Sequence, residues 1–149
     1  MKYSVKFRYQ HTFVLMLSFL LIHTTAHPSE VTLASISNLD DDEFRSDEGN
    51  YFKLIKMNTH CKIEAHFFVS FENTLYSYVF NRTGLISGKE KTFRYNYQKD
   101  HEGSLIHVTD VYQYSSARYD LKDRVISAEI KKDFMRYKAL FPQALLSQC

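Results

Sequence analysis

The stretch that decides the fold is CKIEAHFFVSFENTLYSYVF, residues 61–80. Successive side chains of a β-strand point to opposite faces of the sheet, so alternate residues share a face. The alternate apolar residues are Ile63, Ala65, Phe67 and Val69 in the first half and Tyr76, Tyr78 and Phe80 in the second. Asn73 lies between the halves as a turn residue. The pattern predicts two antiparallel strands, at 61–71 and 75–80, joined by a short turn.

Similar short runs, rich in Phe, Tyr, Val and Ile, lie on both sides of this stretch. They are residues 51–57, 91–97, 105–114, 118–121 and 124–130. No helical pattern separates them, so we predict an antiparallel meander of seven or eight strands, closed into a barrel or curled as a sheet. After residue 131, Phe134, Tyr137 and Phe141 recur at intervals of three and four, which predicts a C-terminal helix that ends at Pro142.

The first 26 residues have the pattern of a cleaved secretory signal. A basic head is followed by the apolar run Thr12–Ile22, and Thr24 and Ala26 supply small residues at the expected cleavage site. The apolar run is too short to cross a bilayer, which needs roughly 20 residues. We therefore expect a secreted, extracellular protein of one domain, residues 51–149, preceded by an acidic leader at 27–50 that contains at most one short helical turn.

The charge balance excludes a large basic surface by composition alone. The predicted signal holds three of the 19 Lys and Arg residues and none of the 17 Asp and Glu residues, so 16 basic and 17 acidic residues remain. We expect no nucleic-acid partner and no membrane partner.

Cys61 and Cys149 are the two cysteines of the chain, and in an oxidising compartment we expect them to be bonded to each other. A loop of this length stabilises the fold by roughly 4 kcal/mol in chain-entropy models. Two cysteines without a CxxC motif or a nearby pair of histidines predict no metal site. Asn81-Arg82-Thr83 is an N-glycosylation sequon, and we predict that it is used.

Asp110 interrupts an apolar pattern in the run LIHVTDVYQY, residues 105–114. Its neighbours on the same strand face are Ile106, Val108, Tyr112 and Tyr114. A carboxylate on a buried face is costly unless a cation or a hydrogen-bond donor meets it. Three explanations are open: Arg94 or Arg118 pairs with Asp110, a bulge turns Asp110 outward, or a ligand supplies the partner.

Aromatic residues on the strand faces favour the ligand explanation. Those on faces that can converge are Tyr76, Tyr78, Phe80, Phe93, Tyr95, Tyr97, Tyr112 and Tyr114. A packed core is the ordinary use of such residues, but buried tyrosine hydroxyls need partners. A barrel pocket with Asp110 suits a cationic aromatic guest, because the carboxylate meets the ammonium group and the rings cover the rest.

Catalysis has little support in the sequence. Serine-hydrolase, zinc-protease, phosphate-loop and calcium-loop motifs are all missing, and the chain has only four glycines. We therefore expect a protein that is not an enzyme and needs no cofactor.

The chain resembles the tick salivary lipocalins, the family that includes the histamine-binding proteins. The residues that carry the resemblance are YFKLIK at 51–56, Cys61, FRYNY at 93–97, VTDVYQYS at 108–115, and the C-terminal helix with its final cysteine. The resemblance implies an eight-stranded antiparallel barrel with a C-terminal helix and a Cys61–Cys149 bridge. It also places Asp110 in the ligand pocket, with Tyr95 or Tyr97 as a pocket aromatic.

The chain departs from the family in three respects. Tyr119 and a position near Asp133 stand where a second disulfide is usual, the chain has no Trp, with Phe44 as a substitute, and the turn at 58–60 is short.

The leading hypothesis is a secreted lipocalin-like barrel, expected to be a monomer, that sequesters a small host mediator. The mediator would be a biogenic amine such as histamine or serotonin, or a lipid. Its predicted ligand-binding residues are Asp110, Tyr95, Tyr97, Tyr112, Tyr78 and Phe93. The alternative is a secreted β-scaffold module that binds or inhibits a host protein, such as a protease or a complement component.

Overall fold

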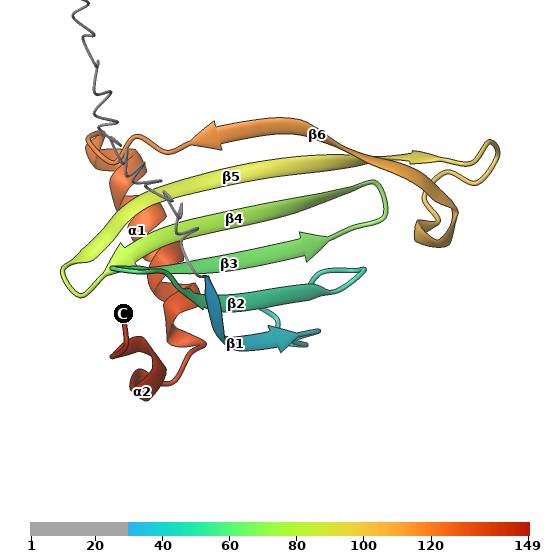
Figure 1. Ribbon diagram of the computed structural model, residues 1–149. Coiled ribbons are helices and arrows are strands. Elements are labelled where there is room, and N and C mark those ends of the chain that lie inside the picture. The colour runs from blue at the N-terminus through green and yellow to red at the C-terminus, as the bar shows by residue number, and fades with distance from the viewer. Residues whose placement is uncertain (1–29) are drawn as a thin grey trace, which may run out of the picture.

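The computed structural model describes residues 30–149, which form one antiparallel sheet with helices after it (Figure 1). The strands are β1 (Val31–Ser37), β2 (Asn50–Lys56), β3 (Cys61–Phe68), β4 (Glu72–Asn81), β5 (Gly84–Tyr97) and β6 (Val108–Arg118). A 3₁₀ turn, η1 (Leu105–His107), precedes β6, and the helices α1 (Arg124–Ala139) and α2 (Gln143–Leu146) follow it. The predicted signal peptide, residues 1–26, lies outside the described residues.

The sheet is a meander, as predicted, but it is open. Each strand pairs with the next along the chain in the order β1-β2-β3-β4-β5-β6, so β1 and β6 are free edges. The expected closure into an eight-stranded lipocalin-like barrel is not found among residues 30–149. A barrel needs its first and last strands to pair, and two of the predicted strands are not strands.

The two missing strands are the segments at 118–121 and 124–130. The first is mostly a link after β6, and the second is the beginning of α1. Asp123 explains the helix, because its side chain accepts hydrogen bonds from the backbone N–H groups of Val125 (2.9 Å) and Ile126 (3.0 Å), as an N-cap does. The segment RVISAEI is rich in β-branched residues, and this misled the prediction, although its buried positions follow helical spacing. The helix predicted after residue 131 is confirmed.

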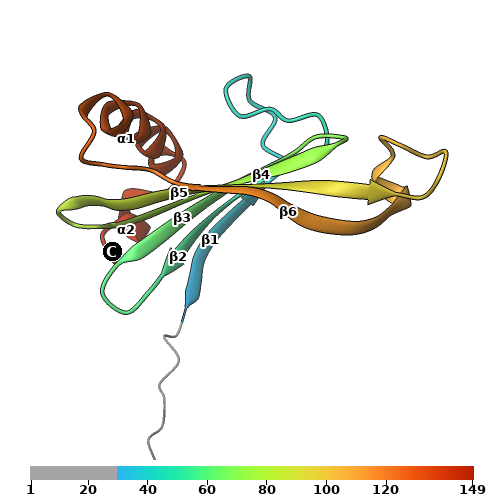
Figure 2. The same cartoon turned by 90° about the horizontal axis from the view of Figure 1, so that it is seen from above.

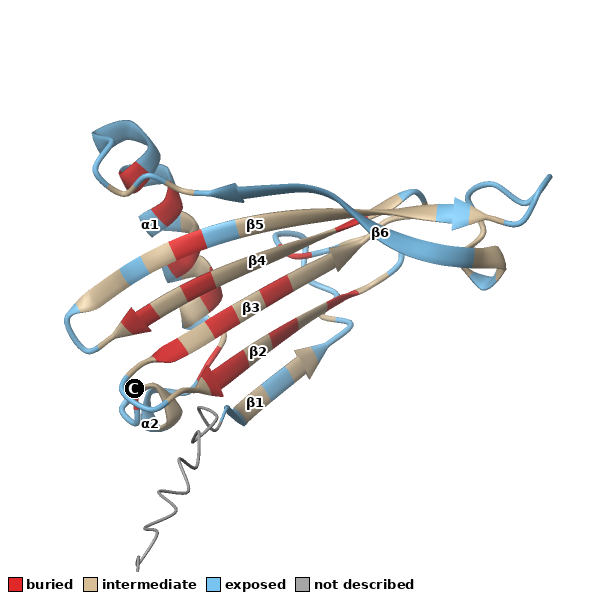
Figure 3. Ribbon diagram, turned by 45° about the horizontal axis from the view of Figure 1, so that its top comes forward, coloured by how far each residue is buried: buried red, intermediate tan, exposed pale blue. Residues whose placement is uncertain are grey.

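The core lies between α1 and one face of the sheet, called here the helix side. Figure 2 shows α1 and the loop that follows β1 on this same side of the sheet. Buried positions alternate along β2, β3 and β4 (Figure 3). The buried hydrophobic residues on the sheet are chiefly Phe52, Leu54, Ile63, Ala65, Tyr78 and Phe80, and those on α1 are Ile130, Phe134 and Tyr137. Each large apolar side chain buried in this way stabilises the fold by about 1.5–3 kcal/mol.

The segment before β2, expected to be an acidic leader, contains a strand and a loop. β1 pairs with β2 along its whole length, with a bulge at Leu33. In the loop, residues 42–44 form a turn where the sequence suggested a short helix. Phe44 is buried at the end of this turn, with its ring centre 5.4 Å from that of Phe52. Gly49 closes the loop at a φ of 100°, a backbone conformation that favours glycine.

The predicted bond between Cys61 and Cys149 is confirmed, with the sulfurs 2.11 Å apart. It joins the start of β3 to the last residue of the chain across 88 positions, and both cysteines are buried. The bond holds α2 against the end of the sheet. None of the helices formed by residues 30–149 is long and apolar enough to span a bilayer.

Candidate functional site

The six residues predicted to bind a ligand lie in three separate places. Tyr78 is in the core beneath α1, with 1% of its surface exposed. Phe93, Tyr95 and Tyr97 lie on the face of β5 that points away from α1, called here the open face. Asp110 and Tyr112 are on the edge strand β6, on the helix side but beyond the part that α1 covers. The structure therefore does not bring these residues into one pocket.

Asp110 is exposed to solvent, opposite Asn96 in the neighbouring strand. All of β6 after Val108 is exposed, because no described element packs on it. Neither arginine considered above forms an ion pair with Asp110: Arg94 lies 3.6 Å from Glu72 instead, and its guanidinium stacks on Tyr114 at 3.6 Å from the ring centre. The carboxylate thus pays no burial cost. A charge on a free sheet edge protects it against pairing with other strands.

The open face of β3, β4 and β5 carries a hydrogen-bonded aromatic group. The buried side chain of Asn73 bonds His66 through its oxygen and donates to the Tyr95 hydroxyl at 2.9 Å. The Tyr97 hydroxyl donates to the carbonyl of Ser70. Nδ1 of His66 is buried without a hydrogen-bond partner among the described residues. Burial lowers the pKa of His66 below its ordinary value, so the ring favours the neutral state.

A second group of polar side chains lies between α1 and the sheet, and the sequence did not indicate it. We call it the tyrosine–carboxylate cluster, and its members are Tyr76, Tyr78, Tyr119, Tyr137, Glu90 and Asp133. Tyr76 lies opposite Glu90 in the β4–β5 pairing. The ring of Tyr137 stacks near Tyr76, with centres 6.3 Å apart, and lies 5.7 Å from Tyr78. The Tyr119 hydroxyl donates to Glu90 at 2.6 Å.

Gly88 explains how Tyr119 reaches this position. A Cβ atom at Gly88 would lie 2.9 Å from the Tyr119 ring and 3.3 Å from Ile130, which is closer than side chains normally approach. The glycine therefore lets the link after β6 pass close to β5. Its neighbour Glu90 is then within reach of the Tyr119 hydroxyl.

The hydroxyl groups of the cluster remain protonated and partly free. Burial raises the pKa of Tyr76, Tyr78 and Tyr137, and burial together with the hydrogen bond to Glu90 raises that of Tyr119. The hydroxyls of Tyr78 and Tyr137 make no hydrogen bond to another described residue, yet neither is a buried unpaired atom. Both rings are buried while their hydroxyl ends keep some contact with solvent, so both hydroxyls can bond a small molecule.

Glu90 and Asp133 are the functional candidates that sequence reasoning missed. Glu90 lies in the charged run KEK at 89–91, which is typical of a solvated strand, and Asp133 lies on the polar side of the predicted helix. Only the pairing of β5 with β4, and the packing of α1, place both carboxylates beside the same tyrosines. The aromatic alternation of Tyr76 and Tyr78 was the one signal that pointed to this location.

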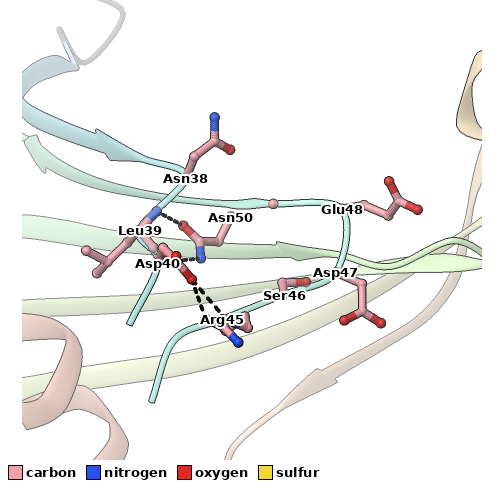
Figure 4. Close-up of a pocket in the computed structure, with 9 residues that line it drawn as sticks. Asn38, Leu39, Asp40, Arg45, Ser46, Asp47, Glu48 and Asn50 are labelled. Atoms are coloured by element: carbon pink, nitrogen blue, oxygen red, sulfur yellow. Dashed lines mark hydrogen bonds and ion pairs between the residues drawn. The ribbon is translucent and has the colours of Figure 1, made fainter. Parts of the chain in front are cut away.

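A surface cavity of about 370 Å³ lies in the loop between β1 and β2 (Figure 4). The polar groups that line it already have partners. The side chain of Asn50 donates to the carbonyls of Leu39 (2.9 Å) and Phe44 (2.7 Å), and Arg45 pairs with Asp40 at 2.8 Å. These bonds hold the loop in shape, so we assign the cavity no ligand.

The remaining predicted sites concern metals and modification. Residues 30–149 contain no group of three or more His, Cys, Asp or Glu side chains placed to hold a metal ion. Asn81 ends β4, and its side-chain oxygen accepts a hydrogen bond from the Thr83 hydroxyl at 2.6 Å. Thr83 is exposed, and glycosylation of Asn81 remains a prediction.

Comparison with known proteins adds no relative. No protein-family model, no curated protein and no solved structure matches this chain. The resemblance to the tick salivary lipocalins therefore has no support from these comparisons.

Proposed function

We propose that this protein is a non-enzymatic binding protein that sequesters a small cationic molecule, such as a biogenic amine, at the tyrosine–carboxylate cluster. The observation that carries the proposal is the pair of buried rings, Tyr78 and Tyr137, whose hydroxyls have no partner among the described residues and lie near two carboxylates. An ammonium group needs what this arrangement offers, namely negative charge, hydrogen-bond acceptors and aromatic rings.

The two carboxylates differ in their availability to a cation. Asp133 already pairs with Arg136, at 3.1 Å on the same helix. Glu90 accepts a hydrogen bond from Tyr119 and has no ion pair within 4 Å among residues 30–149. Glu90 is therefore the proposed anchor for an ammonium group, with the cluster hydroxyls bonding the polar end of the guest. This role replaces the one that sequence reasoning gave to Asp110.

Calorimetric titration with histamine and serotonin tests the proposal. Glu90→Gln keeps an acceptor for the Tyr119 hydroxyl but removes the charge, and we expect it to weaken amine binding at least about tenfold, because charge-assisted hydrogen bonds contribute about 1.5–3 kcal/mol. The matched control is Glu129→Gln, which removes an exposed carboxylate from α1 and should leave affinity unchanged.

Asp110→Asn separates this site from the one predicted by sequence. Unchanged binding in Asp110→Asn together with a loss in Glu90→Gln supports the cluster. The reverse result would return the anchor to Asp110, and no heat with either amine would reject amine binding altogether.

A further inference from the structure

The open face of the sheet carries most of its charge as uncompensated cations. Strand pairing places Lys53, Glu64, Ser77, Lys89 and Arg118 in one row across the strands β2 to β6. Lys91 lies in the next row, beside Leu75. Lys62 is also on this face, and it is ion-paired with Glu64 at 2.9 Å. Five cations thus share this face with one strand carboxylate, which is already paired.

Lys89 and Arg118 are direct cross-strand neighbours, which is an unfavourable arrangement. Like charges opposite each other in a sheet destabilise the pair of strands. Neither residue, nor Lys91 or Lys53, forms an ion pair with an acidic group of residues 30–149. Both Lys89 and Arg118 are exposed. The fold gains nothing from this pair, whereas an acidic partner would neutralise it.

An aromatic band lies beside these cations on the same face. The rings of Tyr51, His66 and Phe68 contact one another, with centres 4.2–6.0 Å apart, and Phe93 is 6.4 Å from His66. The four residues are half-buried, and Tyr95 continues the band along β5. No helix or loop of the described residues packs over this band, since α1 lies on the other side of the sheet (Figure 2). Aromatic rings beside cations are common features of protein interfaces.

We propose that the open face is a docking surface for an acidic segment of a protein partner. Acidic side chains of the segment would neutralise Lys89, Lys91 and Arg118, while its apolar side chains would cover the aromatic band. Apolar contact favours a protein over a sulfated polysaccharide or an anionic lipid headgroup, because those ligands would use the cations and leave the rings uncovered. The surface is separate from the tyrosine–carboxylate cluster, which lies on the helix side.

The test uses a fluorescent peptide in which Glu alternates with Phe and Leu. We expect it to bind the full mature protein, to bind more weakly as salt is raised, and to shift the NMR signals of Lys91 and Phe93. Lys89→Glu/Arg118→Glu should reduce its affinity at least about tenfold, because two attractive contacts become repulsive. The matched control is Lys131→Glu/Lys132→Glu, which makes the same charge change at exposed positions of α1.

Four results would overturn the proposal. The first is an equal loss of affinity in the control variant, and the second is a peptide with Lys in place of Glu that binds as well. The third is binding of heparin or of phosphatidylserine vesicles without binding of the peptide. The fourth is a dimer in light scattering that dissociates in Lys89→Glu/Arg118→Glu, which would assign the surface to a second copy of this chain.

Discussion

Phe134 offers the most direct test of how α1 packs on the sheet. Its side chain is 3% exposed, and its ring centre lies 5.2 Å from that of Phe80 and 6.0 Å from that of Tyr78. Replacing a buried Phe with Ala costs about 3–5 kcal/mol of unfolding free energy through lost burial and a residual cavity. Two aromatic neighbours add about 0.5–1.5 kcal/mol each to such a site, so we expect a loss of about 4 kcal/mol for Phe134→Ala.

Thermal and urea unfolding, followed by circular dichroism, measure this loss. Globular proteins gain about 2.1 cal/mol/K of entropy per residue on unfolding, so about 120 residues give about 0.25 kcal/mol/K and a fall in Tm of about 16 °C. The matched control is the adjacent Met135→Ala, where the side chain is 57% exposed and the expected change is within about 0.5 kcal/mol. A loss of less than about 1.5 kcal/mol in Phe134→Ala, or equal losses in both variants, would refute the packing of α1 described here.

Three further predictions concern the disulfide, the helix cap and a buried histidine. Cys61→Ala/Cys149→Ala should lower the unfolding free energy by about 4–5 kcal/mol, the loop-closure value for 88 residues, as measured by urea unfolding. Asp123→Ala should cost about 0.5–2 kcal/mol in the same assay, because it removes the N-cap of α1. His66 has a pKa lowered by burial, so the unfolded chain takes up its proton first, and stability should be full above about pH 6.5 and fall as the pH decreases below it. His66→Gln should flatten this dependence in unfolding curves recorded between pH 5 and 7.5.

Each of these predictions has a control and a contradicting outcome. Reduction of the wild-type protein should reproduce the loss in the cysteine variant, and a change of less than about 1 kcal/mol would contradict the role of the bond. Lys131→Ala, at an exposed position of α1, should match the wild type, whereas Asp123→Ala should not. If the wild type and His66→Gln lose stability equally on acidification, a group other than His66 is responsible.

The strands that sequence reasoning located well are those with one buried face. In β2, β3 and β4, apolar side chains alternate with polar ones because α1 covers only one side of the sheet. The same alternation failed in β6, where Val111 and Tyr112 are 50% and 41% exposed. Apolar residues on an edge strand look like core residues in the sequence, since exposure depends on whether another element packs there.

The strand predicted at 124–130 failed for a different reason. Its Val and Ile residues favour β-structure locally, but Val125 and Ile126 are 69% and 39% exposed in the first turn of a helix. Local preference is weak compared with the burial of Ile130, Phe134 and Tyr137 along one side of α1. Without this strand the sheet has too few strands to close, so one wrong element changed a barrel into an open sheet.

The sequence by itself determined the antiparallel meander, the C-terminal helix after residue 131 and the Cys61–Cys149 bond, because these depend on local periodicity and on the count of two cysteines. Only the tertiary structure decided the location of α1 and therefore which side chains are buried. It placed Asp110 in solvent and gathered Glu90, Asp133 and the tyrosines beside one another. It also aligned Lys89 with Arg118 on the open face. These groupings join residues from different elements, and strand register and helix packing bring them together in ways that no local pattern records.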